Sequence, residues 1–107
     1  MRRRVLLSFL FALSSLAAQG PTRDVHGTVT RGGEPVRGAI VELKDTKTLA
    51  VRSFITDKNG HYQFYDLNTD SDYEIRAQYH GKWSQTYRLS RFNEAHHPTI
   101  NLKIRTE

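Results

Sequence analysis

Thr56-Asp57-Lys58-Asn59-Gly60-His61-Tyr62-Gln63-Phe64 is the stretch that decides the fold. Its Asn-Gly pair is typical of tight hairpin turns, because both residues tolerate a left-handed backbone. Beyond the turn, Tyr62 and Phe64 alternate with polar neighbours, which indicates a strand with one apolar face. The stretch therefore predicts a hairpin whose strands are Leu49–Thr56 and His61–Tyr65.

The same period of two continues outward on both sides of this turn. Polar and glycine-rich turns separate short alternating segments, at the spacing typical of an antiparallel β-sandwich. No helical period occurs after residue 18, so we predict an all-β domain of seven strands. The expected strands are Asp24–Thr30, Ala39–Lys44, Leu49–Thr56, His61–Tyr65, Tyr73–Gln78, Trp83–Leu89 and Thr99–Ile104. The expected core is Val25, Val29, Val36, Ala39, Val41, Leu43, Val51, Ile55, Tyr62, Phe64, Leu67, Tyr73, Ile75, Ala77, Ile100, Leu102 and Ile104.

The N-terminal segment has the pattern of a secretory signal peptide. Three arginines at 2–4 precede an apolar run, Val5–Leu16, and small residues follow as far as Ala18. The run is shorter than the ~20 residues of a spanning helix. We therefore predict a cleaved signal at residues 1–18, a domain at 19–107, a secreted or periplasmic location and no membrane span after cleavage. An uncleaved anchor and a buried helix are the alternatives.

Charge and cysteine content exclude several functions. Thirteen of the sixteen Lys and Arg residues and all eleven acids follow residue 18, which leaves a net charge of +2 for the exported part. These charges form no basic stripe, so no nucleic-acid partner is expected. The chain has no cysteine, which excludes disulfides, thiol catalysis and cysteine-ligated zinc.

Two segments carry a resemblance to a known family. Gly27-Thr28-Val29 is followed by Gly33-Glu34-Pro35-Val36-Arg37-Gly38-Ala39-Ile40-Val41-Glu42-Leu43. The opening stretch, Thr56–Phe64, is followed by Leu67 and by Tyr73-Glu74-Ile75-Arg76-Ala77. Together they resemble the carboxypeptidase regulatory-like family. The resemblance implies a transthyretin-like or prealbumin-like Greek-key sandwich that acts as a non-catalytic accessory module. Asn68–Asp72 replaces the family's usual Pro-Gly turn.

Two groups of side chains are of the types that bind metals, but neither group has the sequence spacing of a known metal site. Five histidines are scattered along the chain, and only two of them are adjacent. Four acids cluster between 66 and 74 without the spacing of a calcium loop. Solvated histidines and a polar loop are the favoured readings, and no metal or cofactor is predicted. The residues are His26, His61, His80, His96 and His97, then Asp66, Asp70, Asp72 and Glu74.

Aromatic residues exceed what the expected core uses. Rings at a sheet surface could pack at strand edges, stack on sugars or anchor a protein contact. We predict a binding module whose partner is a protein at the cell envelope, with an extracellular glycan as the alternative. The candidate binding surface is Trp83, Tyr87, Tyr79 and Tyr65, with Trp83 foremost, and Phe54 and Phe92 are the further surplus rings.

A catalytic reading has little support in the residues. Enzymes of the transthyretin fold that hydrolyse 5-hydroxyisourate carry a first-strand histidine, and His26 holds a similar position. Their C-terminal Tyr-Arg-Gly-Ser is missing, since this chain ends Ile104-Arg105-Thr106-Glu107. No nucleophile and base stand at a recognisable spacing. The prediction is therefore a protein that is not an enzyme.

Overall fold

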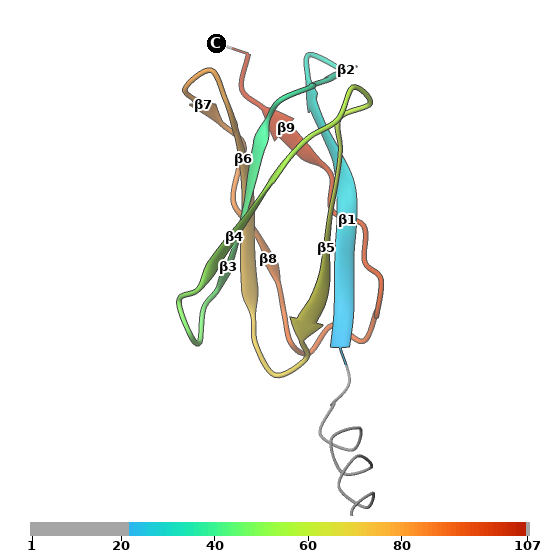
Figure 1. The fold of residues 1–107 in the computed structure, drawn as a ribbon, viewed down its shortest axis with the longest axis vertical. Helices are drawn as coiled ribbons and strands as arrows, with labels where there is room; N and C mark the ends of the chain where they lie inside the picture. The colour runs from blue at the N-terminus through green and yellow to red at the C-terminus, as the bar shows by residue number, and fades with distance from the viewer. Residues whose placement is uncertain (1–21, 107) are drawn as a thin grey trace, which may run out of the picture.

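The protein folds into two β-sheets packed face to face (Figure 1). A computed structural model describes residues 22–106, so the predicted signal peptide lies outside the described residues. Within 22–106 every regular element is a strand, and no helix there could span a membrane. The strands are β1 (Thr22–Arg31), β2 (Glu34–Pro35), β3 (Ile40–Asp45), β4 (Val51–Ile55), β5 (His61–Asn68), β6 (Tyr73–Tyr79), β7 (Lys82–Trp83), β8 (Tyr87–Leu89) and β9 (Leu102–Ile104).

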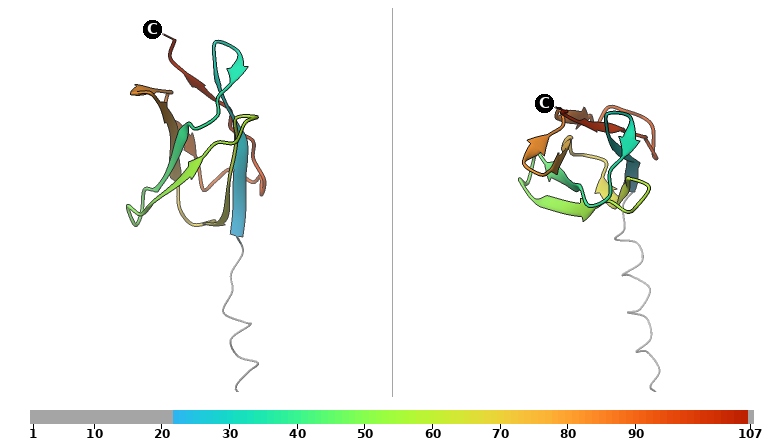
Figure 2. Two further views of the ribbon diagram at one scale, coloured as in Figure 1. Left: turned by 45° about the horizontal axis from the view of Figure 1, so that its top comes forward. Right: turned by 90° about the horizontal axis from the view of Figure 1, so that it is seen from above.

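The predicted β-sandwich is confirmed. A four-stranded sheet has the order β2-β1-β5, with β9 also paired to β1. A five-stranded sheet has the order β4-β3-β6-β7, with β8 also paired to β6. The two sheets lie on opposite sides of the molecule (Figure 2). The strand pairs are antiparallel except β1 and β9, which run parallel.

The core lies between the sheets and consists of the inward side chains of both. Alternate residues of β1, β5 and β9 face alternate residues of β3, β6 and β8. Leu89, which is absent from the expected core, is buried opposite Tyr73. The buried apolar residues are Val25, Val29, Val36, Ala39, Val41, Leu43, Tyr62, Phe64, Leu67, Tyr73, Ile75, Ala77, Leu89, Leu102 and Ile104.

The expected core placement of Val51 and Ile55 is wrong. Their side chains are 55% and 67% exposed. Phe54 of the same strand pairs with the buried Val41, and paired residues lie on the same face of a sheet. Phe54 therefore packs against the core, while Val51 and Ile55 point outward. Ile100, also expected in the core, is only partly buried against it.

The tight turn at 57–60 forms, but the predicted hairpin is wrong. Gly60 has a φ of 75°, and its N–H donates to the Asp57 carbonyl at 2.9 Å. The Asp57 carboxylate accepts the N–H of His61 at 2.9 Å. However, β4 belongs to the five-stranded sheet and β5 to the four-stranded sheet. The turn therefore carries the chain between layers, and a Cβ at Gly60 would lie 2.6 Å from the Val29 carbonyl oxygen.

The expected strand Trp83–Leu89 is divided in two. The Ser84 N–H donates to the Ala77 carbonyl at 2.8 Å, as in a regular ladder. The Ala77 N–H instead donates to the Ser84 hydroxyl at 2.9 Å, so a side chain replaces the next backbone partner. The chain leaves the sheet there and returns as β8, which pairs with β6 from Tyr87.

Candidate functional site

The structure separates the four aromatic residues of the predicted binding surface. Trp83 pairs with Gln78 and lies on the outer face of the five-stranded sheet. Tyr79 and Tyr87 are partly buried against the core. Tyr65 is 54% exposed on β5, in the other sheet. The four rings therefore do not share one face, and Trp83 is the member that lies on the outer face of the five-stranded sheet.

A row of side chains crosses the outer face of the five-stranded sheet beside Trp83. The strand register places Ile55 opposite Ile40, Ile40 opposite Gln78, and Gln78 opposite Trp83. Directly opposed residues of neighbouring strands have their Cβ atoms ~5 Å apart. The row therefore joins two exposed isoleucines to the tryptophan across four strands, and we call it the outer row.

A shallow hollow lies beside the outer row on the same face. Its volume is about 480 Å³. Apolar side chains at one margin adjoin charges of both signs that come from the neighbouring strands. Its lining residues are Glu42, Lys44, Leu49, Val51, Glu74, Arg76 and Thr86. An exposed apolar patch beside mixed charge is typical of a surface that contacts other proteins.

Arg76 links the hollow to the outer row. Its guanidinium carbon lies 3.9 Å from the centroid of the Trp83 ring. Its Nε also contacts Glu42 Oε1 on the neighbouring strand at 3.3 Å. One side chain thus stacks on the aromatic ring and pairs with an acid, which orients Trp83 against the sheet. The pair is solvent-exposed, so its contribution to stability is small.

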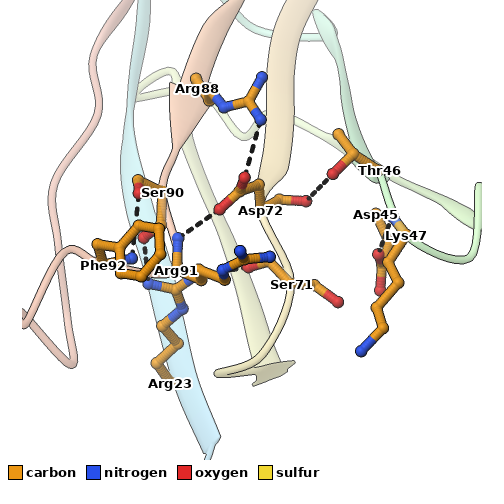
Figure 3. A network of polar contacts seen from close by, with 10 residues as sticks. All are labelled: Arg23, Asp45, Thr46, Lys47, Ser71, Asp72, Arg88, Ser90, Arg91 and Phe92. Carbon is orange, nitrogen blue, oxygen red and sulfur yellow. Dashed lines mark hydrogen bonds and ion pairs between the residues drawn. The ribbon is translucent and has the colours of Figure 1, made fainter.

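Among the described residues, the acids between 66 and 74 form no group that could hold a metal ion. Asp72 accepts the Arg91 N–H on Oδ1 at 2.6 Å and Arg88 Nη2 on Oδ2 at 2.8 Å (Figure 3). The Arg91 N–H and the Arg88 guanidinium hold the pKa of Asp72 below its usual value. The Asp72 carbonyl accepts the N–H and hydroxyl of Thr46. Asp72 therefore joins β8 and the following loop to the loop after β3.

A buried arginine lies in the same region. Arg23 Nη1 donates to the Ser90 carbonyl, and Nη2 donates to the Ser71 carbonyl, both at 2.9 Å (Figure 3). These contacts bring the first strand together with the loop before β6 and the loop after β8. These two hydrogen bonds to carbonyl oxygens satisfy Nη1 and Nη2 without a carboxylate partner, while the buried Nε has no hydrogen-bond partner among the described residues. Arg23 therefore has a structural role.

The histidines lie in separate places. His26 and His61 face each other on the outer face of the four-stranded sheet, with ring centroids 6.3 Å apart, and His26 Nε2 lies 3.0 Å from the Thr99 hydroxyl. His97 Nδ1 contacts Asp24 at 2.7 Å, and His80 stacks on Tyr79. Among the described residues, no three metal-ligating side chains come together.

Sequence reasoning missed most of the outer row. Ile40 is absent from the expected core, whereas Ile55 is included in it. Only the pairings of β4 with β3, of β3 with β6 and of β6 with β7 show that both isoleucines lie in line with Trp83. Arg76 gave no signal, because an alternating arginine on a strand is usually a solvated side chain.

Comparisons with solved structures show the same fold. The C-terminal domain of the shaft pilin spaA from Lactobacillus rhamnosus GG gives a TM-score of 0.57 at 8% identity, covering 82% of this chain and 100% of that chain. A DUF3823 family protein from Parabacteroides merdae gives a TM-score of 0.55 at 14% identity, covering 80% of this chain and 47% of that chain. The group B streptococcus pilus 2b backbone protein gives a TM-score of 0.52 at 14% identity, covering 79% of this chain and 42% of that chain.

The last two matches leave more than half of the other chain outside the alignment. At these identities they establish architecture alone. Among curated proteins, none matches this sequence.

The family model of the carboxypeptidase regulatory-like domain matches residues 24–105. That range runs from β1 through β9 and includes both segments on which the resemblance rests. The chain belongs to the carboxypeptidase regulatory-like domain family.

Proposed function

We propose that this protein is an exported, non-catalytic module that binds a protein partner at the cell envelope through the outer face of its five-stranded sheet. One observation carries the proposal, namely the outer row. It sets Ile55, Ile40 and Trp83 in line on one exposed face, beside a hollow of mixed charge. Interfaces characteristically combine an aromatic anchor with apolar neighbours and a polar rim.

The compartment is part of the same proposal. Residues 1–18 act as a signal peptide that is removed, and residues 19–107 are the exported domain. Two of the similar structures are named as pilus proteins, which supports a place in the cell envelope or outside the cell. A regulatory-like family also supports an accessory role without catalysis.

A glycan is the less favoured partner. Sugar rings stack on flat aromatic faces, and such sites commonly present two or more rings together. Of the four candidate rings, Trp83 alone lies on the outer face, and the Arg76 guanidinium covers one side of it. Protein contact makes use of the isoleucines as well as of the tryptophan.

Single substitutions on the outer row test the proposal. Trp83→Ala removes the anchor and should weaken partner binding by about 2 kcal/mol, or roughly 30-fold. Ile40→Lys should weaken it as well, and it leaves the ring in place. Phe92→Ala is the matched control, because Phe92 is a highly exposed ring on the loop after β8. Binding is measured as the amount of each envelope protein captured by the immobilised full chain.

Thermal melting of each variant separates lost binding from lost folding. A folded Trp83→Ala variant that captures its partner as well as the wild type removes Trp83 from the site. Equal losses in Trp83→Ala and Phe92→Ala would show that the outer row is not the contact. Displacement of the captured protein by soluble glycans would point to the alternative class of ligand.

A further inference from the structure

Strand β4 lies at one edge of the five-stranded sheet. The Asp45 N–H donates to the Ala50 carbonyl, and the Thr56 N–H donates to the Ala39 carbonyl, both at 2.9 Å. These bonds fix the alternation along the antiparallel pair. Arg52 and Phe54 direct their backbone groups toward β3. Val51, Ser53 and Ile55 direct theirs toward the open edge.

The other described edge strands are short or interrupted. β2 and β7 have two residues each, β8 and β9 have three, and β2 contains Pro35. The ladder of β5 shifts register between Arg23 and Val25, and Asp66 has a φ of 60°. The Tyr65 carbonyl of β5 already accepts Arg52 Nη1 at 2.9 Å. Such features are the usual protection against edge-to-edge pairing.

β4 has little of this protection. Its five residues form regular pairs with β3 and include neither proline nor glycine. At its two ends, Val51 and Ile55 expose more than half of their side chains. A regular edge with exposed β-branched residues is a template for another strand.

We propose that β4 pairs with β4 of a second copy of this chain, antiparallel and about a two-fold axis at Ser53. In this register Val51 lies opposite Ile55 of the partner subunit, and Ser53 lies opposite Ser53 of the partner subunit. The three outward-directed residues of each strand then meet their equivalents, so that every free edge group is paired. The result is one continuous sheet through both copies.

The neighbouring registers are less favourable. A shift of two residues in one direction places Arg52 directly opposite Arg52 of the partner subunit, and like charges in that position repel. A shift in the other direction places Phe54 opposite Phe54 of the partner subunit and leaves Val51 without a partner. The register at Ser53 instead sets Arg52 across from the ring of Phe54 of the partner subunit, an arrangement that suits a cation and a π-system.

The interface is small, because it consists of one five-residue strand from each copy. Contacts of that size give dissociation constants in the micromolar range or weaker, about 1–100 µM. The pairing uses the backbone edge of β4, whereas the proposed partner contact centres on Trp83, but Ile55 and Val51 belong to both surfaces. Trp83→Ala and Ser53→Pro separate the two, because the first should weaken partner binding and keep the dimer, and the second should remove the dimer and leave Trp83 in place.

Sedimentation velocity of the full chain over a concentration series tests the pairing with two matched double variants. Val51→Glu with Ile55→Lys places opposite charges across the interface twice and should retain the dimer. Val51→Glu with Ile55→Glu places like charges there twice and should weaken it by about 10-fold or more. Both carry the same change at Val51, so its contact with Lys44 of β3 is the same in each.

A second pair of variants tests the backbone directly. Ser53→Pro removes an N–H that points away from β3, so the monomer should fold while the dimer is lost. Ser53→Ala keeps the N–H and should still dimerise. Circular dichroism checks the fold of each variant. A wild-type chain that stays monomeric at millimolar concentration, or equal dimerisation of the two charge variants, overturns the proposal.

Discussion

At the scale of single residues, Gly27 occupies a tightly confined position in β1. A Cβ placed there would overlap the carbonyl oxygen of Ile100 and come within 3.0 Å of the Tyr62 ring. The same carbonyl accepts the Tyr62 hydroxyl at 2.6 Å, and burial raises the pKa of that hydroxyl. The absence of a side chain at Gly27 allows the segment before β9 to run beside β1 closely enough for this bond to form.

Gly27→Ala should therefore destabilise the protein by about 3 kcal/mol, because backbone has to move to admit one methyl group. Urea denaturation measures the loss. Gly33→Ala is the control, since an added Cβ there meets no atom within 4 Å, and it should cost only about 1 kcal/mol of backbone strain. A urea midpoint of the Gly27→Ala variant equal to that of the wild type would show that the chain around Ile100 can move away from Gly27.

At the scale of elements, carboxylates at turns hold the strands and loops in place. The N–H of His61 and the N–H of Arg91 lower the pKa of Asp57 and of Asp72, respectively. Burial opposes ionisation of Asp45, yet the N–H groups of Lys47 and Thr48 keep its pKa below the usual 3.8. All three acids therefore ionise more readily in the folded chain than in the unfolded chain.

This difference makes stability depend on acid pH. The unfolded chain takes up protons first as the pH falls, so the stabilisation is complete above 3.8 and is lost as the pH drops through the lower folded-state pKa values. The urea midpoint should fall between about pH 5 and about pH 2. Asp72→Asn should make the urea midpoint depend less on pH and should lower this midpoint at pH 5. Asp70→Asn, on the exposed loop, should show the same urea midpoints as the wild type. An equal acid slope in Asp72→Asn would contradict the role of this carboxylate.

The same scale shows why one strand was predicted correctly and another was not. β6 alternates strictly, with Tyr73, Ile75 and Ala77 inward, so its buried face could be identified from the sequence. β4 has apolar residues of both parities, and its edge position leaves one face in water. The Phe54 side chain points inward because Phe54 pairs with Val41, a residue in another part of the chain.

At the scale of the whole molecule, the fold was predictable where turns and alternation are local and was not predictable where distant segments pair. The assignment of β4 and β5 to different sheets follows from contacts of β5 with β1, about 40 residues earlier. The candidate site was not predictable for the same reason, since it too depends on the pairing of distant segments. Trp83 could be singled out as a surplus ring, but the outer row depends on three strand pairs that no local pattern reveals.

Export also belongs to this scale. We predict cleavage after Ala17 or Ala18, because small residues at those positions follow the apolar run. The intact mass of the protein recovered from the periplasm or the medium should correspond to a chain that begins at residue 18 or 19. Recovery of a chain that still carries Met1 or Arg2 would contradict the assignment of a signal peptide.

The parallel pairing of β1 with β9 has a mechanical consequence. The N-terminal end of β1 lies at one end of the sandwich and the C-terminal end of β9 at the other, while hydrogen bonds join the two terminal segments along their length (Figure 1). Tension applied between the two ends would pull these neighbouring strands past each other in shear. Their bonds would then have to break together, whereas bonds peeled from one end break in turn. The domain is thereby suited to bear load along its chain.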